Sequence, residues 1–241
     1  HRIASSHAAE VTTSTVQLPD EEMKGRIIGK EGRNIKTLER ITGCDLIVDD
    51  TPGIITISSF SPIRRQVAKL ALEKLIEDGR IQPARIEAFV EDAKKDLARD
   101  MKKAAEEALY EMGITGLDPK LVMIVGRLKY RYSYGQNNII HAKEVANLSA
   151  LLAEELGVDR ALARKAGFLH DIGKAIDHET DGGHPEIGYR ILLKFGLPEE
   201  IAYCCIAHHE DKPKTLLGAI VKAADAISGG RPGARRDSYE Q

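Results

Sequence analysis

The sequence predicts an α+β domain followed by an all-α domain. Short runs rich in β-branched residues alternate with short helices in the first part of the chain, whereas the later segments have helical periodicity and no strand pattern. Aromatic residues make up only 5% and Trp is absent, so the cores depend on Leu, Ile, Val and Ala, which favours helices. A length of 241 residues is enough for two ordinary domains.

The first domain has the predicted order strand, helix, helix, strand, strand, helix. A run of β-branched residues at 11–18 is expected to form a strand that Pro19 ends, and Asp20 can cap the helix that follows. Gly43 is placed to end the second helix, and Ser61 with Pro62 provides a cap and a first-turn proline for the third. The expected helices are 23–28, 33–43 and a third from 62, and the expected second and third strands are 45–48 and 54–59, joined by a DDTPG turn.

The remainder of the chain is predicted to be helical. Pro83 opens a long, highly charged helix that ends at Gly113, and Asp118 with Pro119 starts the next one. We expect a leader at 1–10, the α+β domain at 11–80, a helical linker at 81–117 and the all-α domain at 118–241. Within the last domain, helices are expected at 139–156, 159–169, 185–195, 198–209 and 214–228.

Charge and cysteine content limit the classes of function. A formal net charge of −2 gives no overall attraction to nucleic acid, so such binding must come from local basic patches. Three cysteines without a CxxC pair indicate a reducing compartment and no cysteine-based zinc or redox centre. The chain shows no signal peptide and no apolar run long enough for a bilayer, and it starts at His1, so we expect a cytoplasmic fragment of a longer protein.

Two glycines separated by two polar residues lie between the first two predicted helices, in the segment IIGKEGRNI at 27–35. Glycines let the backbone approach a ligand where a Cβ would clash, and the helix that follows presents free N–H groups to a phosphate. Lys30, Arg33 and Arg26 add positive charge. A plain interhelical turn is the alternative interpretation.

This segment and the element order together resemble the KH domain family in its type I form, βααββα. The resemblance implies that the loop clamps the backbone of single-stranded RNA while an apolar groove receives the bases. Glu31 departs from a loop position that is often basic, which weakens phosphate attraction, and protein contact in place of RNA is the open alternative. The RNA-binding residues implied are Arg26, Ile28, Gly29, Lys30, Glu31, Gly32 and Arg33.

Most histidines of the chain follow the order H…HD…H…HH…D, which an aspartate closes. Neutral imidazole and carboxylate are ligands that first-row divalent ions accept, and seven candidates exceed what one ion can use. We therefore expect two ions, which can clamp the attacking and leaving oxygens of a phosphodiester. For any single histidine, a core or surface role is the alternative. The expected ligands are His141, His170, Asp171 and Asp225 for the first ion, with His184, His208 and His209 for the second.

The expected catalytic residues are His170, Asp171 and Lys174. Asp171 has two oxygens and can bridge two ions. Lys174 lies three residues beyond it, on what we expect to be the same helical face, and can stabilise charge developing on a phosphoryl oxygen. Basic clusters lie on both sides of this region and are expected either to contact phosphates or to form solvated surface: Arg127, Lys129 and Arg131 before it, and Arg231, Arg235 and Arg236 after it.

The ligand order resembles the HD superfamily of metal-dependent phosphohydrolases. A KH domain joined to an HD domain, with GRIIGKEGRNIKTLE, ALEKLIEDGRIQPARIE, LHDIGKAIDHE and AADAISGGRPGARR, is similar to the ribonuclease Y family of bacterial endoribonucleases that start mRNA decay. The resemblance implies cleavage of single-stranded RNA by metal-activated water, with 5′-phosphate and 3′-hydroxyl products and with Mn²⁺, Mg²⁺ or Zn²⁺ as cofactor. It also implies a homodimer or higher oligomer, contact with RNA-degradation machinery, and anchoring of the full-length protein to the inner face of the cell membrane, although this fragment itself makes no membrane contact.

Two alternatives use the same residues. Many HD proteins hydrolyse nucleotides or cyclic dinucleotides, and the ligands alone do not distinguish these substrates from RNA. The second alternative is an RNA-binding scaffold whose HD domain is not catalytic. A purely structural zinc site is disfavoured, because open, histidine-rich coordination followed by a lysine is typical of catalytic sites rather than closed cysteine-rich ones.

Overall fold

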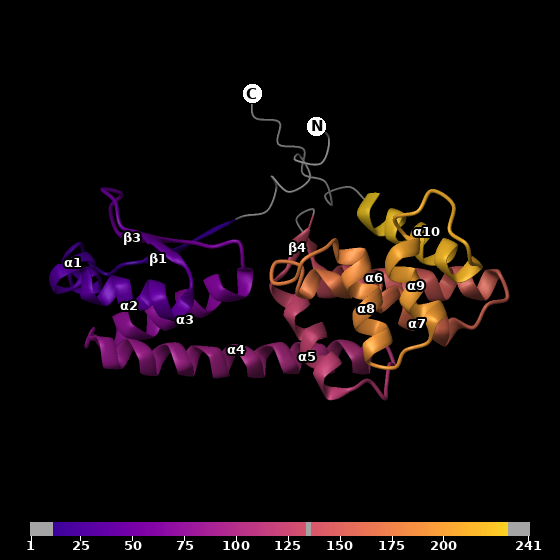
Figure 1. Ribbon diagram of the computed structural model, residues 1–241, viewed down its shortest axis with the longest axis horizontal. Coiled ribbons are helices and arrows are strands. Elements are labelled where there is room, and N and C mark those ends of the chain that lie inside the picture. Colours follow the sequence, from indigo (N-terminus) through magenta and orange to yellow (C-terminus); the bar gives the residue numbers. More distant parts are fainter. Residues whose placement is uncertain (1–11, 134–135, 231–241) are drawn as a thin grey trace, which may run out of the picture. The chain divides into compact units, whose positions relative to one another are not determined.

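A computed structural model describes residues 12–133 and 136–230 of the chain (Figure 1). These residues separate into two compact units that divide between Asp100 and Met101, called here the N-terminal and C-terminal units. The leader expected at 1–10 and the arginine cluster expected at 231–236 lie outside the described residues. Within the described ranges, no helix combines the length and the apolar character that a membrane crossing requires.

The N-terminal unit contains a three-stranded antiparallel sheet with the order β1-β3-β2. The central strand β3 (Ile54–Ser58) pairs along its whole length with β1 (Thr13–Gln17), and its other edge pairs with β2 (Asp45–Ile47). Because side chains alternate along a strand, Val16 and its partner Ile55 point to the same face, where both are buried. This face of the sheet forms one side of the core.

Helices supply the rest of this core. The expected order βααββα is confirmed, with a short 3₁₀ helix at Lys30–Gly32 between the first two helices. The predicted caps are present: the Asp20 carboxylate accepts from the Met23 amide at 2.8 Å, Ser61 accepts from Arg64, and Gly43 ends its helix in the left-handed conformation. The helices are α1 (Glu22–Ile28), α2 (Arg33–Thr42) and α3 (Pro62–Asp78).

The long helix α4 (Pro83–Glu111) is also confirmed as a single helix. Its first part belongs to the N-terminal unit, where Lys74 of α3 forms an ion pair with Asp96. Its last part belongs to the C-terminal unit. The buried apolar side chains recur at helical spacing in both parts: Ile86, Val90, Ala93 and Leu97, then Met101, Ala105, Ala108 and Leu109.

The C-terminal unit is built mainly from helices, and one prediction about it was wrong. Two-residue strands, β4 (Tyr132–Ser133) and β5 (Gln136–Asn137), form an antiparallel pair in a region where no strand was expected. Strands this short carry no alternating pattern that a sequence could reveal. The helices are α5 (Pro119–Arg127), α6 (Asn138–Glu155), α7 (Arg160–Leu169), α8 (His184–Lys194), α9 (Glu199–Ala207) and α10 (Leu216–Gly230), with 3₁₀ helices at Leu128–Tyr130 and Ile172–Ala175.

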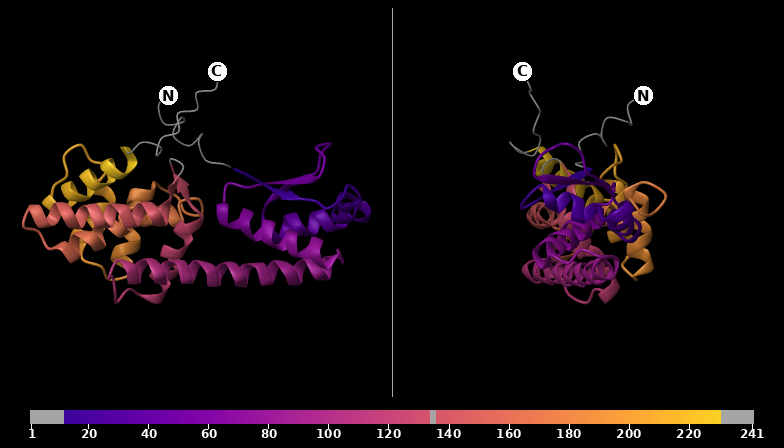
Figure 2. Two further views of the ribbon diagram at one scale, coloured as in Figure 1. Left: turned by 180° about the vertical axis from the view of Figure 1, so that it is seen from behind. Right: turned by 90° about the vertical axis from the view of Figure 1, so that its left-hand side faces the viewer.

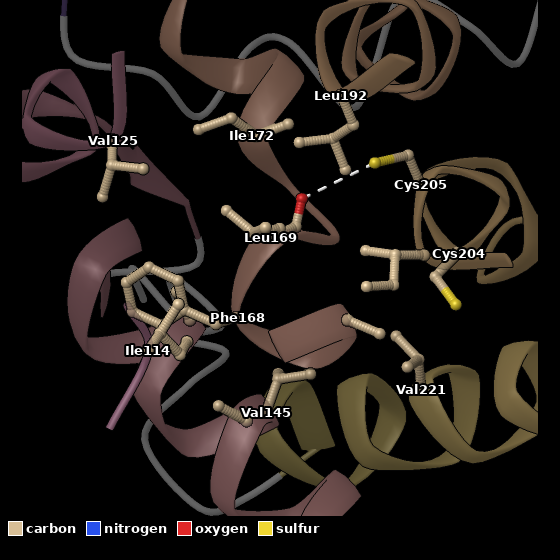
Figure 3. Packing of buried hydrophobic residues seen from close by; sticks show 14 of the residues in the cluster. Ile114, Val125, Val145, Phe168, Leu169, Ile172, Leu192, Cys204, Cys205 and Val221 are labelled. Carbon is tan, nitrogen blue, oxygen red and sulfur yellow. Dashed lines mark hydrogen bonds between the residues drawn. The ribbon is translucent and has the colours of Figure 1, made fainter. Parts of the chain in front are cut away.

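Helix α7 packs against α6, α9 and α10 (Figures 1 and 2). Phe168 and Leu169 at its end are buried among side chains of the surrounding helices, and the Leu169 carbonyl accepts from the Cys205 thiol (Figure 3). A Cβ on Gly167 would lie 2.6 Å from Ser149 Oγ, so glycine permits the close approach of α6 and α7. The core therefore fixes the end of α7, where the candidate site begins.

Candidate metal centre and nucleic-acid interface

The seven expected metal ligands come together in the C-terminal unit. Five segments far apart in sequence supply them, and Nε2 atoms of four histidines face the carboxylate oxygens of the two aspartates. The fifth histidine, His209, faces another imidazole, with its Nε2 lying 3.0 Å from that of His184. The ligands are His141 on α6, His170 and Asp171 directly after α7, His184 at the start of α8, His208 and His209 directly after α9, and Asp225 on α10.

Asp171 lies at the centre of this cluster. Its Oδ2 is 3.6 Å from His141 Nε2 and 3.3 Å from His170 Nε2. Its Oδ1 faces the other side, 3.6 Å from His184 Nε2 and 3.4 Å from His208 Nε2. One carboxylate oxygen thus faces each of the two histidine sets, which is the arrangement that a carboxylate bridging two ions requires.

The chemistry of these atoms fits a divalent cation. The ligand atoms of His141, His170 and Asp171 lie within 4.8 Å of one another, and so do those of His184, His208 and His209. Two of these buried atoms, His170 Nε2 and Asp171 Oδ1, have no hydrogen-bond partner among the described residues. Buried polar atoms without partners are rare because they cost free energy, and a cation would satisfy both. A third set of ligand atoms within 4.8 Å of one another comes from His170, His208 and Asp225.

Hydrogen bonds at Nδ1 hold three of the rings with Nε2 toward the cluster. His170 Nδ1 is 2.6 Å from the Gly167 carbonyl, and His208 Nδ1 is 3.0 Å from the Cys204 carbonyl. A carbonyl only accepts, so each Nδ1 must carry a proton. The lone pair that a metal ligand needs is therefore at Nε2, which is unprotonated in the neutral ring. His141 Nδ1 lies 3.0 Å from the hydroxyl of Ser228 instead.

The local backbone at the HD pair differs from the prediction. Asp171 does not continue α7, because the helix ends at Leu169 and Asp171 has φ −107° and ψ 16°. The chain then enters the 3₁₀ helix that contains Lys174. Residues three apart are aligned in such a helix, and Lys174 Nζ still donates to Asp171 Oδ2 at 2.9 Å. The expected contact is therefore present, although the expected α-helical face is not.

Electrostatics in the cluster oppose the effect of burial. Burial by itself would lower the pKa of His170, but the carboxylates of Asp171 and Asp225 outweigh it and raise that pKa to about 10. Burial would likewise raise the pKa of Asp171, yet His170 and Lys174 hold it well below its usual range. At His184 burial dominates and lowers the pKa to about 3. Asp171 is thus ionised at neutral pH, and His184 is neutral there.

Both arginines of the basic cluster before the site form ion pairs within the C-terminal unit. Arg131 is buried and pairs with Asp177 at 3.1 Å, so the alternative of a solvated surface is wrong for this residue. Arg127 pairs with Glu179 at 2.6 Å and donates to the Ala175 carbonyl. Together these arginines hold the segment that follows the HD pair.

The glycine loop of the N-terminal unit has a backbone conformation with three positive φ angles. Gly29 and Gly32 have φ of +73° and +72°, and Glu31 between them also has a positive φ of 57°. A Cβ on Gly29 would lie 2.7 Å from Asn34 Nδ2. The buried Asn34 amide donates to the carbonyls of Arg26 at 3.0 Å and Ile81 at 3.1 Å, so it anchors the loop. Sequence reasoning did not single out Asn34, although an asparagine two residues after the second glycine is a signal of local hydrogen bonding.

The expected RNA-contact residues separate into two groups. Lys30, Glu31 and Arg33 lie on the loop with their side chains at least partly exposed, and Ile28 is half-buried beside it. Arg26 instead donates to the Gly79 carbonyl at the end of α3, so its charge is held at that helix terminus. Among the expected residues, Lys30 and Arg33 therefore offer positive charge to a phosphate at the loop, and Glu31 opposes them.

Comparison with known proteins agrees with these two sites. Residues 13–74 match the family model for the KH domain, and residues 138–230 match the one for the HD domain. The chain thus contains a KH domain followed by an HD domain. These ranges fall within the domains expected at 11–80 and 118–241.

The full-length comparison is more specific. The chain is 56% identical to the Ribonuclease Y of Thermoanaerobacter pseudethanolicus and 55% identical to that of Alkaliphilus metalliredigens, over 99% of its own length. Over almost its whole length, the chain is thus similar to part of these Ribonuclease Y proteins. The alignments cover 47% and 50% of these relatives, so the chain spans about half the length of the curated proteins it matches.

Proposed function

We propose that this chain is the RNA-binding and catalytic part of a metal-dependent endoribonuclease that cleaves single-stranded RNA and initiates mRNA decay. The observation that carries the proposal is the convergence of five histidines and two aspartates around Asp171, in a chain that also contains a glycine loop of the KH type. The two relatives named above are both called Ribonuclease Y, which supports RNA as the substrate.

We infer that the centre holds two divalent ions, Mn²⁺, Mg²⁺ or Zn²⁺. When bound, such ions supply a water of lowered pKa and positive charge for the phosphoryl oxygens. The two disjoint ligand groups and the position of Asp171 between them support two ions rather than one. We assign His141, His170, Asp171 and Asp225 to the first ion and His184, His208 and His209 to the second.

The side chains contribute charge and position to the reaction. Asp171 is ionised at neutral pH, so both of its oxygens are free of protons and can accept. Lys174 Nζ is held 2.9 Å from Asp171 Oδ2, which keeps a positive charge beside the cluster, where it can stabilise the negative charge that develops on the phosphoryl group. Attack by water leaves a 5′-phosphate and a 3′-hydroxyl, and the RNA 2′-hydroxyl takes no part.

The KH loop is proposed to hold the RNA backbone. Gly29 and Gly32 allow the positive φ values with which the loop leads into α2, and the start of that helix offers free backbone N–H groups to a phosphate. Lys30 and Arg33 provide the local positive charge that a chain with net charge −2 lacks overall. By family resemblance, the proposal extends to self-association, to contact with other RNA-degrading proteins and to membrane anchoring of the longer protein.

Cleavage of a 5′-labelled single-stranded RNA in Mn²⁺ or Mg²⁺ tests the proposal. The unmodified chain is compared with His170→Ala/Asp171→Ala and with His178→Ala, which removes a histidine outside the three ligand groups. We expect internal cuts that need a divalent ion, persist in the His178 variant and disappear in the double variant. A cyclic dinucleotide is incubated in parallel. Hydrolysis of the dinucleotide with intact RNA would replace the endoribonuclease proposal with a nucleotide phosphodiesterase.

A further inference from the structure

A hydrogen-bonded chain of side chains leads from β5 to the ring of His141. Gln136 Nε2 donates to Glu144 Oε2 at 2.8 Å, and the hydroxyl of Ser228 donates to the same Oε2 at 2.7 Å. The Ser228 hydroxyl also lies 3.0 Å from His141 Nδ1. Gln136, Ser228 and His141 are all buried, so these bonds are shielded from competing water.

We propose that Glu144 and Ser228 are positioning residues for the metal centre, which set the tautomer and the orientation of His141. The inference rests on the proposed metal site and adds two side chains that are not themselves ligands. It assigns them a specific task, which is to keep the proton of His141 on Nδ1 and its lone pair on Nε2.

The number of available protons decides which atom donates in each of these hydrogen bonds. An ionised carboxylate can only accept, so the single hydroxyl proton of Ser228 goes to Glu144. The Ser228 oxygen then has only lone pairs left for His141, and Nδ1 must be the donor. Neutral imidazole carries one ring proton, so Nε2 is left unprotonated. Gln136 keeps the Glu144 oxygen turned toward Ser228.

Two side chains of helix α10 contact the two ring nitrogens of His141. Ser228 holds Nδ1, and Asp225, three residues earlier on α10, lies 3.0 Å from Nε2. Without the Ser228 acceptor, the proton can move to Nε2 and bond to Asp225, which would block the ligand lone pair. The hydroxyl therefore excludes the one tautomer that competes with an ion.

His141 differs in this respect from two other ligands. His170 and His208 are held by backbone carbonyls of Gly167 and Cys204, within a turn of their own helices. Those acceptors are supplied by any residue type, whereas the acceptor for His141 depends on two side chains 84 residues apart. Orientation of His141 should consequently be sensitive to single substitutions that change no ligand.

Calorimetric titration with Mn²⁺ alone tests the inference on the whole chain. Ser228→Ala is compared with Ser149→Ala, which removes another buried serine hydroxyl, from α6, that has no hydrogen-bond partner among the described residues. We expect Ser228→Ala to weaken Mn²⁺ binding by about tenfold to a hundredfold, and Ser149→Ala to leave it unchanged. Glu144→Ala should cause a smaller loss than Ser228→Ala, and Glu144→Gln a smaller one still, because the amide oxygen can still accept from Ser228.

A double variant and a spectroscopic measurement separate positioning from general destabilisation. Ser228→Ala/Glu144→Ala should bind Mn²⁺ no more weakly than Ser228→Ala alone, because Glu144 acts through the hydroxyl. In long-range ¹H–¹⁵N spectra of the Zn²⁺-loaded protein, His141 should carry its proton on Nδ1. Additive losses, or unchanged Mn²⁺ affinity in Ser228→Ala, would overturn the inference while the metal centre stands. Absence of Mn²⁺ binding in the unmodified chain would overturn the centre itself and this inference with it.

Discussion

The two candidate sites differ in what forms them: the KH loop is formed mainly by the backbone and the HD centre by side chains. The KH loop depends on backbone conformation at two glycines within one short segment, and its charged side chains reach solvent. The HD centre depends on seven side chains from five segments, and four of these side chains are buried: His141, His170, Asp171 and His208. One site is local and open to solvent, whereas the other exists only when the whole C-terminal unit has folded.

This difference indicates how each site should respond to change. A loop that uses backbone N–H groups and a few exposed charges should lose affinity gradually, as single charges are removed. A centre in which one carboxylate faces four imidazoles should lose its function when that carboxylate is altered. Substitutions in the two units should therefore differ in size and in the property that they affect.

The largest effect is expected from Asp171→Asn. The change preserves shape but removes the negative charge that both histidine sets and Lys174 face. Mn²⁺ affinity in calorimetry should fall by more than about a hundredfold, beyond the loss typical of residues that only support a ligand. Binding of a short single-stranded RNA should remain within experimental error. An equal loss of RNA binding would show that the two sites are not independent.

A large effect on stability is expected from Gly173→Ala. A Cβ there would lie 1.9 Å from the His184 carbonyl oxygen and 2.8 Å from the Gly188 nitrogen, both of them backbone atoms of α8. Overpacking of this kind costs about 1–3 kcal/mol or more, and urea unfolding measures it as a fall in the free energy of unfolding. Gly229→Ala on α10 is the control, because nothing lies within 4 Å of its Cβ. Equal stability of the two variants would contradict the close packing of α8.

A moderate effect is expected from Lys30→Ala/Arg33→Ala in the KH loop. Both side chains reach solvent, and removal of each charge that binds a phosphate should reduce the salt dependence of RNA binding by about 0.7 in log–log slope. Filter binding over a series of salt concentrations measures both affinity and slope, and Mn²⁺ affinity should not change. Lys102→Ala/Lys103→Ala on α4 removes the same charge elsewhere. An identical decrease in both double variants would indicate non-specific attraction rather than a loop site.

The smallest effect is expected at Asp78, at the end of α3. Hydrogen bonds from Arg80, with help from Arg85, lower the pKa of this carboxylate to about 2, from an ordinary value of 3.8. A lowered folded-state pKa contributes stability above the ordinary pKa, and that contribution is lost as the pH falls toward the folded value. Asp78→Asn should therefore lower the thermal midpoint slightly at pH near 5, and the difference should shrink as the pH approaches about 2. A constant difference over this range would exclude the ion pairs as its cause.

Much of the fold and the ligand set followed from local patterns. Asp20, Ser61 and Gly43 act at helix ends within a few residues, so their effect can be read from neighbouring positions. The order of histidines and aspartates was informative for a different reason. Few other arrangements explain so many ligand-type residues in one helical domain, and the structure brings all seven together.

Other features could not be predicted because they depend on contacts between distant segments. The burial of Arg131 follows from Asp177, which lies 46 residues further along the chain. The Glu144–Ser228 bond joins two helices whose separation the sequence does not reveal. The signal that existed was weak: each residue lies three positions after a ligand, His141 or Asp225, and so on the same side of its helix.

The two adjacent cysteines on α9 have a consequence for which metals the centre accepts. Burial raises the pKa of Cys204 to about 12 and that of Cys205 well above its usual range, so both sulfurs remain protonated. Thiolate is the form that captures soft, thiophilic ions such as Cu⁺, and a buried thiol does not offer it. Although the Cys204 carbonyl orients His208, its sulfur does not compete with the imidazoles. The donor set stays limited to nitrogen and oxygen, which disfavours poisoning of the centre by thiophilic metals.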